Sequence, residues 1–136
     1  YGNVAGVSVA SAHGVSLGAN YEKTIKAFKE AEEFDGPSLI IAYAPCVAHG
    51  IDMSKTEEEM SRAVHSGYFE IYRYNPINNH LELDFEEPDL SYEEFLAGET
   101  RFSSLKKINP ESKELFEKSK QDAENRLKLL KKLTNN

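Results

Sequence analysis

The sequence is poor in sulfur-containing residues and has no long apolar run. Its 136 residues include two methionines and one cysteine, Cys46, so no disulfide can form within the chain. A single thiol fits the cytoplasm or another reducing compartment. No stretch approaches the roughly 18 consecutive apolar residues of a membrane-spanning helix, so we expect no membrane segment. Residues 1–4 lack the features of a secretory signal and an initiating Met, and we expect the natural N-terminus to lie upstream.

Basic residues are scarce outside the C-terminal end. The formal net charge of −7 argues against nucleic-acid binding. Residues 1–100 hold 6 Lys or Arg and 18 Asp or Glu, a net charge of −12, whereas residues 101–136 hold 10 and 5, a net charge of +5. The basic end could dock on an acidic partner or pack as a solvated helix against its own domain, and we favour the second interpretation. With 40% hydrophobic residues, the chain is one globular domain or a piece of one.

The first third of the chain has the pattern of a strand, a helix and a second strand. Residues 3–10 are small and apolar and predict a short strand, while residues 11–18 are typical of a loop. Asn20 is a good N-cap for a helix over residues 21–34. Its apolar face would carry Tyr21, Ile25, Phe28 and Ala31. Residues 38–43 are continuously apolar, as in a parallel strand buried on both faces. We therefore expect a βαβ unit.

The middle of the chain predicts a helix followed by a β-hairpin. Residues 54–57, Ser-Lys-Thr-Glu, match a capping box and open a helix that ends near Ser66, with Gly67 as its C′ residue. The aromatic-rich residues 68–74 and the alternating residues 81–85 predict two strands. The Asn-Pro-Ile-Asn-Asn sequence between them is turn chemistry, so the two strands should pair.

The C-terminal third predicts helices. A second capping box at residues 91–94 opens a short helix, and residues 101–108 predict one or two further helical turns. Asn109 and Pro110 are an N-cap and a first helical residue, from which a long helix runs to about Leu133. This helix has a narrow apolar stripe formed by Phe116, Ala123, Leu127 and Leu130.

The cysteine lies where a predicted strand gives way to a turn. Cys46 follows the apolar run in the sequence Ala-Pro-Cys-Val-Ala-His-Gly, and open α/β sheets collect their chemistry beyond the carboxyl ends of strands. Cys46 and His49 could be half of a zinc site or a nucleophilic pair. Zinc needs four ligands, or three with water, and the other three histidines lack ligand spacing. On residue types alone, a buried, inert cysteine is the favoured interpretation.

Three other groups of residues receive no catalytic role. The amides of residues 14–20 could bind phosphate at a helix N-terminus, but the sequence is neither G-x-G-x-x-G nor a P-loop, so its glycines should serve turning and close packing. The carboxylates of residues 57–59 are expected to interact with a helix dipole, and those of residues 86–87 to be solvated in a loop. The tyrosines at positions 68, 72 and 74 are expected to pack on the sheet.

A long ordered series of segments carries a family resemblance. The segments include Gly-Ala-Asn-Tyr (18–21), Thr-Ile-Lys-Ala-Phe-Lys-Glu-Ala-Glu (24–32), Asp-Gly-Pro-Ser-Leu-Ile-Ile-Ala-Tyr (35–43) and Pro-Cys-Val-Ala-His-Gly-Ile (45–51). They continue with Gly-Tyr (67–68), Tyr-Arg-Tyr-Asn-Pro (72–76), Glu-Pro (87–88), Arg-Phe (101–102), Ser-Leu-Lys-Lys (104–107) and Asn-Pro (109–110). From Val15 onward, the chain resembles pyruvate:ferredoxin (flavodoxin) oxidoreductase.

The resemblance implies the fold and its place in a longer polypeptide. The chain looks like the C-terminal stretch of the family's protein, with an α/β fold: a partial parallel sheet of a thiamine-diphosphate-binding fold, an added β-hairpin and a long C-terminal helix. Residues 1–90 would be the C-terminal half of the thiamine-diphosphate-binding domain, and residues 91–136 a helical C-terminal tail. In the family, the segment that leads into the Gly-Ala-Asn helix start is shorter than the corresponding segment of residues 1–20. This difference indicates a short insertion, or first residues that do not belong to the family sequence.

The resemblance also implies an activity, cofactors and partners. The family's enzyme decarboxylates pyruvate on thiamine diphosphate with Mg²⁺, transfers the acyl unit to coenzyme A, and passes electrons through three 4Fe–4S clusters to ferredoxin or flavodoxin. The cysteine of this segment is the family's fourth ligand of the cluster nearest the thiamine, which makes Cys46 the candidate metal ligand. No residue here takes a catalytic role on the family's pattern. The partners would be the rest of the polypeptide and a second copy in a homodimer.

Two alternatives differ from this interpretation. A related 2-oxoacid:ferredoxin oxidoreductase would share this segment, because the substrate-contacting residues lie elsewhere. A stand-alone interaction module would use the basic helix of residues 110–133 as its docking surface. In either oxidoreductase, we expect the isolated segment to be inactive and colourless, because one cysteine cannot supply the four ligands of a 4Fe–4S cluster.

Overall fold

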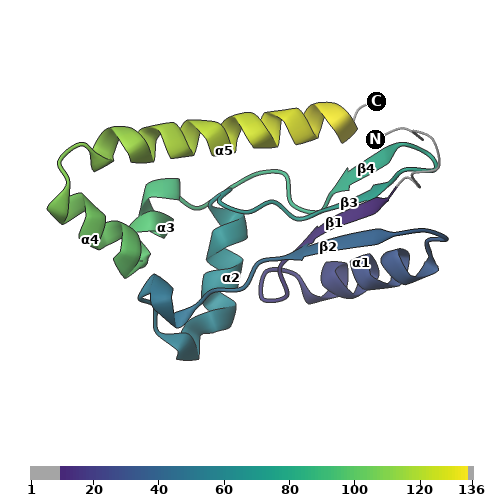
Figure 1. The fold of residues 1–136 in the computed structure, drawn as a ribbon, viewed down its shortest axis with the longest axis horizontal. Helices are drawn as coiled ribbons and strands as arrows, with labels where there is room; N and C mark the ends of the chain where they lie inside the picture. The colour runs from purple at the N-terminus through teal and green to yellow at the C-terminus, as the bar shows by residue number, and fades with distance from the viewer. Residues whose placement is uncertain (1–9, 135–136) are drawn as a thin grey trace.

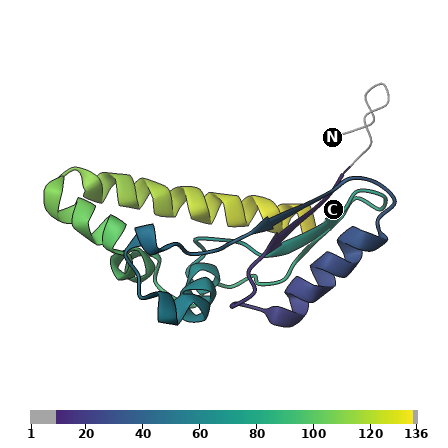
Figure 2. The ribbon, with the colours of Figure 1, turned by 60° about the horizontal axis from the view of Figure 1, so that its bottom comes forward.

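A four-stranded sheet organises residues 10–134, the part of the chain that the computed structural model describes (Figure 1). The strands are β1 (Ser11–Val15), β2 (Ser38–Ala42), β3 (Tyr72–Asn75) and β4 (His80–Leu83). The helices are α1 (Tyr21–Glu33), α2 (Thr56–His65), α3 (Tyr92–Gly98), α4 (Thr100–Ile108) and α5 (Ser112–Thr134). In Figure 2, α1 lies below the sheet and α5 runs along the opposite side. No helix in residues 10–134 has the length and apolar character to cross a bilayer.

The sheet is mixed, with strand order β2-β1-β3-β4. β1 and β2 pair in parallel and are connected by α1, which confirms the predicted βαβ unit. β3 and β4 form the predicted antiparallel hairpin, and β3 also pairs antiparallel with β1. The hairpin is therefore continuous with the parallel pair and forms half of a single sheet.

The loop predicted over residues 11–18 is wrong for its first part. The structure places β1 at Ser11–Val15, and the predicted strand at residues 3–10 lies outside the described residues, apart from residue 10. His13 and Gly14 were expected to lie in that loop, yet both lie in β1. Gly14 fits there because a Cβ atom would lie 2.7 Å from the Tyr72 ring and 2.8 Å from the Glu70 carbonyl oxygen. The glycine serves close packing between strands.

The predicted burial of β2 and α1 was also wrong for the described chain. β2 is an edge strand, and its Leu39 and Ile41 side chains are 54% and 44% exposed. α1 turns Thr24 and Ala27 inward, so the apolar residues expected to face the core are largely exposed. The exposed apolar set on these two elements comprises Tyr21, Ile25, Phe28, Leu39 and Ile41.

The core lies between α2, α3 and α5 rather than under the parallel strands. Its buried residues are Ala63, Tyr92, Phe95, Leu96 and Ala123, with the Tyr68 ring packed 4.7 Å from Phe95. The stripe predicted on α5 is confirmed, because Ala123 is buried and Phe116, Leu127 and Leu130 are partly buried. α5 therefore packs against its own domain, as we favoured.

Three ion pairs add to this packing of α5. Lys120 Nζ lies 2.7 Å from Glu93, Arg126 Nε lies 2.8 Å from Glu70, and Lys131 Nζ lies 2.5 Å from Glu87. The basic helix thus finds acidic partners within the same chain, on α3 and on the segments flanking the hairpin. The Lys120 pair also holds the pKa of the Glu93 carboxyl at about 2.

Helix starts agree with the sequence where a side chain caps the backbone. Asn20 Oδ1 accepts the Lys23 N–H at 2.9 Å, and Ser91 Oγ accepts the Glu94 N–H at 3.3 Å, as predicted. The predicted Ser54 capping box does not form, because Asp52 accepts the Ser54 N–H and caps a preceding 3₁₀ turn. α5 begins at Ser112 rather than Pro110, after a turn in which Asn109 accepts the Glu111 N–H.

A buried charge cluster links the hairpin to α1. Arg73 on β3 is 4% exposed and makes a two-pronged pair with Asp84, Nε to Oδ2 and Nη2 to Oδ1, both at 2.9 Å. Glu30 of α1 lies 2.5 Å from Arg73 Nη1, and Lys23 lies 2.9 Å from Asp84. Burial opposes the charged guanidinium, but the hydrogen bonds and charge of Asp84 prevail and raise the pKa of Arg73.

Candidate functional site

The two parallel strands end side by side, and the cysteine lies just beyond them. Val15 at the end of β1 is opposite Ala42 at the end of β2, and the Val15 carbonyl accepts the Tyr43 N–H at 3.0 Å. The chain then passes through the buried Pro45 to Cys46. This is the carboxyl edge of the parallel pair, where open α/β sheets place ligands.

Cys46 presents its sulfur at the surface from a turn with defined geometry. Its backbone is extended (φ −126°, ψ 150°), and it caps the 3₁₀ turn Val47–His49. The Ala48 N–H donates to Cys46 Sγ at 3.5 Å, and the residue is exposed. The burial of the cysteine, which residue types alone favoured, is therefore wrong for the described chain.

His49 faces the backbone of Cys46. Its Nδ1 accepts the Cys46 N–H at 3.3 Å, which closes a reciprocal capping box with the sulfur–amide contact. Cys46 and His49 are thus brought together, as the sequence spacing allowed. The contacts of both residues stabilise the turn: the Cys46 sulfur accepts the Ala48 N–H, and the His49 imidazole accepts the Cys46 N–H. In residues 10–134, no group of three His, Cys, Asp or Glu is placed to hold a metal ion.

A fully buried carboxylate lies behind this turn. Glu99, at the junction of α3 and α4, has Oε1 at 3.7 Å from His49 Nδ1 and accepts the Tyr43 hydroxyl at 3.5 Å. Its Oε2 accepts the Arg101 Nε–H at 2.5 Å, and the Arg101 guanidinium lies over the Phe102 ring. Burial, reinforced by the Glu99 charge, raises the pKa of the Tyr43 hydroxyl, so Tyr43 remains a hydrogen-bond donor.

Glu59 of α2 extends the same cluster. It is 7% exposed, and its Oε1 has no hydrogen-bond partner among the described residues. Burial raises the pKa of Glu59, opposed by the Arg62 charge and reinforced by Glu99. Residues 57–59 lie in the first turn of α2, as expected for partners of its dipole, but the burial of Glu59 was not predicted. Sequence reasoning missed Glu59 and Glu99, because nothing in the local pattern marks a carboxylate whose partners lie far along the chain.

Gly50 closes the cysteine turn against α4. Its φ of +73° lies in the left-handed region, and its N–H donates to the Val47 carbonyl at 3.0 Å. The Gly50 carbonyl accepts the Thr100 hydroxyl at 2.7 Å. A Cβ atom at position 50 would overlap the Thr100 side chain, so both the conformation and the close approach require glycine.

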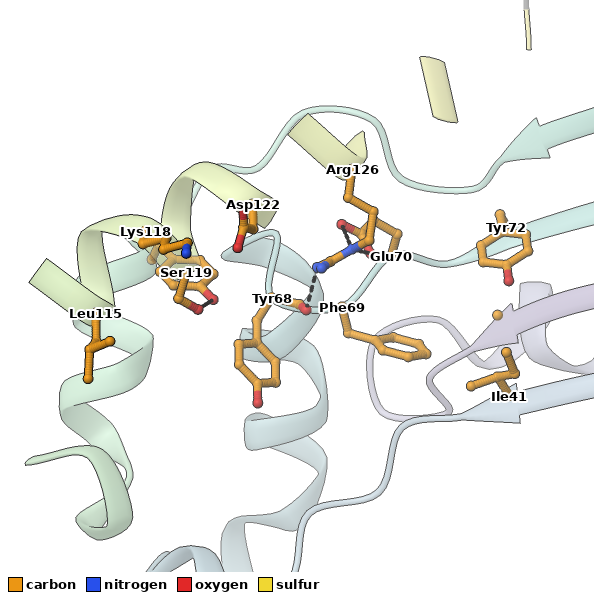
Figure 3. A pocket seen from close by; sticks show the side chains of 12 residues that line it. Ile41, Tyr68, Phe69, Glu70, Tyr72, Leu115, Lys118, Ser119, Asp122 and Arg126 are labelled. Atoms are coloured by element: carbon orange, nitrogen blue, oxygen red, sulfur yellow. Dashed lines mark hydrogen bonds and ion pairs between the residues drawn. The ribbon is translucent and has the colours of Figure 1, made fainter. Parts of the chain in front are cut away.

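A cavity lies away from Cys46, between the sheet and α5. It has a volume of about 660 Å³. Figure 3 shows the Glu70–Arg126 pair spanning it, with Arg126 Nε 3.0 and 2.8 Å from the two carboxylate oxygens. Arg126 Nη2 also donates to the Tyr68 carbonyl at 3.1 Å. Glu70 and Arg126, two of the polar residues that line this cavity, are thus engaged with each other.

The remaining sequence candidates have structural contacts. In residues 14–20, the Gly18 backbone packs on α2, where a Cβ would lie 2.7 Å from the Glu57 carbonyl oxygen, which confirms the packing role of the glycine. The histidines are dispersed: His13 is buried in β1, His65 contacts Asp89 at 2.6 Å, and His80 begins β4. Tyr72 and Tyr74 lie on β3, and Tyr68 packs in the aromatic core.

Known proteins give a consistent match. No family model matches the chain. The pyruvate:ferredoxin oxidoreductase of Moorella thermoacetica is 49% identical over 125 residues, which cover 88% of this chain and 11% of that protein. The chain is homologous to a segment of this oxidoreductase. The pyruvate-flavodoxin oxidoreductases of Enterobacter agglomerans and a Nostoc species are 48% and 44% identical, over 88% and 93% of this chain and 11% and 10% of those proteins. The chain thus spans about a tenth of the curated relatives it matches.

Proposed function

We propose that this chain is part of a pyruvate:ferredoxin or pyruvate-flavodoxin oxidoreductase. Residues 1–90 would complete the thiamine-diphosphate-binding domain, and residues 91–136 would form its helical tail. The complete polypeptide would decarboxylate pyruvate, form acetyl-coenzyme A and reduce ferredoxin or flavodoxin, as a homodimer in a reducing compartment. Identity of 44–49% over about nine-tenths of the chain supports this origin.

Within that enzyme, we assign Cys46 as one thiolate ligand of a 4Fe–4S cluster. The observation that carries the assignment is an exposed sulfur at the carboxyl edge of the parallel strands. Thiolate is the ligand type that such clusters require. The described residues supply one ligand of the cluster, the Cys46 thiolate. The other three thiolates, the binding site for thiamine diphosphate and the ligands of its Mg²⁺ would come from the rest of the polypeptide.

The turn around Cys46 has the properties of a cluster-binding segment. The Ala48 N–H already points at the sulfur, and amide hydrogen bonds to ligand sulfurs help to set the potential of a cluster. Cys46 is held by the buried Pro45 on one side and the left-handed Gly50 on the other. The bound cluster would supply one-electron transfer. The chain's own contribution is to orient the sulfur and to stabilise its negative charge.

The test uses the complete polypeptide with Cys46→Ala and, as a matched control, Val47→Ala. Val47 is adjacent in the turn and 70% exposed. We expect Cys46→Ala to lose one cluster's iron and pyruvate-dependent reduction of the electron acceptor, while Val47→Ala keeps both. Unchanged iron content in Cys46→Ala would refute the ligand assignment.

Two alternatives predict different results. A related 2-oxoacid oxidoreductase would turn over another 2-oxoacid faster than pyruvate in the same assay. A stand-alone module docking through its basic helix is disfavoured, because Lys120, Arg126 and Lys131 of α5 already pair with carboxylates of their own chain.

A further inference from the structure

The turn that carries Cys46 is held by residues about fifty positions later in the sequence. These residues, Glu99 and Thr100, form the junction between α3 and α4. We propose that Glu99 and Thr100 are positioning residues that fix the Cys46 sulfur in the direction needed to ligate the cluster. This inference rests on the proposed role of Cys46 and assigns a function to the first helices of the C-terminal tail.

Glu99 holds the segment that leads into the turn through the Tyr43 hydroxyl. The carboxylate is fully buried, and its two oxygens have different partners: Oε1 accepts the Tyr43 hydroxyl, and Oε2 accepts the Arg101 Nε–H. A buried carboxylate that lost these partners would be strongly destabilised, so the arrangement is held in place. Tyr43 lies three residues before Cys46, so Glu99 anchors the chain where it enters the turn, and within the turn His49 Nδ1 accepts the Cys46 N–H.

Thr100 fixes the other end of the same turn. Its hydroxyl and its N–H both point at the Gly50 carbonyl, at 2.7 and 3.4 Å. Gly50 in turn donates its N–H to Val47, which closes the 3₁₀ turn. Two neighbouring residues of the α3–α4 junction therefore hold the segment that leads into a five-residue loop, and the end of that loop, with Cys46 at its first position.

This arrangement has a consequence for metal binding. A single 3₁₀ turn at the surface has few hydrogen bonds of its own, and a ligand displaced by about 1 Å binds its metal poorly. The contacts from Glu99 and Thr100 supply the support that the turn lacks. Because they come from the chain after residue 98, loss of that support should loosen the cluster even though Cys46 itself is intact.

The test compares matched variants in the complete iron-loaded polypeptide. Thr100→Val removes the hydroxyl but keeps the shape, and Thr100→Ser restores the hydroxyl. Glu99→Gln removes the buried charge, and Glu94→Gln removes a charge from the exposed surface of α3. The readouts are the rate of iron release to a chelator, and the EPR spectrum and midpoint potential of the cluster.

We expect Thr100→Val and Glu99→Gln to release iron about tenfold faster, the size of one lost hydrogen bond, and to shift the EPR spectrum and the potential. Thr100→Ser should restore the wild-type values, and Glu94→Gln should match them. If Glu99→Gln does not fold, Thr100→Val decides, because Thr100 is exposed and valine keeps its shape.

Wild-type release rate, spectrum and potential in Thr100→Val would overturn the positioning role. Failure of the two proposals is distinguishable. If Cys46→Ala loses the cluster while Thr100→Val behaves as wild type, only the positioning role is wrong. If Cys46→Ala keeps the cluster, the ligand assignment is wrong and the positioning role is overturned with it.

Discussion

Gly50→Ala should destabilise the cysteine turn far more than the same change at Gly67. Both glycines have φ of +73°, so alanine suffers the same left-handed strain at each, about 1–2 kcal/mol. The surroundings differ. At Gly67 the first atom that a new Cβ would meet is Pro88 Cγ, at 3.2 Å, whereas at Gly50 it would overlap Thr100 and displace the Thr100–Gly50 hydrogen bond.

The extra cost at Gly50 follows from that contact. Losing the hydrogen bond costs about 1 kcal/mol, and relieving the overlap requires movement of α4 that adds about 1–2 kcal/mol. We therefore expect Gly50→Ala to lower the free energy of unfolding by about 2 kcal/mol more than Gly67→Ala does. Urea denaturation followed by circular dichroism measures both. Equal losses at the two positions would show that α4 does not hold the turn closely.

Three further predictions concern stability, and denaturation measures each. Arg73→Met should lower the free energy of unfolding by about 3–5 kcal/mol, because it leaves Asp84 buried without its two-pronged partner. Lys23→Met removes a more exposed partner of the same carboxylate and should lower it by under about 1 kcal/mol. Similar losses for the two variants would contradict the buried Arg73–Asp84 pair. Asn20→Ala should cost about 1 kcal/mol by removing the cap of α1, and Asn20→Ser should recover most of it. Burial raises the pKa of Glu59, so its carboxyl favours folding most at low pH and loses that contribution as the pH rises through the folded pKa. Glu59→Gln should thus gain stability over wild type as the pH rises above the ordinary titration range of glutamate, and a constant difference would refute the shift.

Local signals predicted much of the fold. Asn20 marked the start of α1 because its side chain caps that helix in the structure, and the turn between β3 and β4 was marked by its Asn and Pro residues. The apolar spacing on α5 also identified its inward face, because a surface helix buries one stripe. In each case the deciding interaction lies within a few residues or one helical period.

The errors came from interactions that are distant in sequence. β1 was missed because Gly14 is required by the approach of Tyr72 from β3, which the local pattern does not show. The apolar residues of α1 and β2 were assigned to a core that the described chain does not provide, a difference consistent with its spanning about a tenth of its relatives. Glu99 was missed because the turn it supports lies about fifty residues earlier.

Cys46 itself was found from residue type, position after a strand and family resemblance together. Residue type alone favoured an inert buried thiol, and the exposure of Cys46 contradicts the burial. Its role as a cluster ligand remains a prediction, and the structure contributes the geometry against which it can be tested.

The most direct test of the central claim is alkylation of Cys46 by iodoacetamide in the complete polypeptide, with the modified peptide measured by mass spectrometry before and after iron is removed. The account predicts that Cys46 is protected while the cluster is present and becomes reactive once the iron is gone, because the free turn exposes its sulfur. Full modification of Cys46 in the iron-loaded protein would contradict the account.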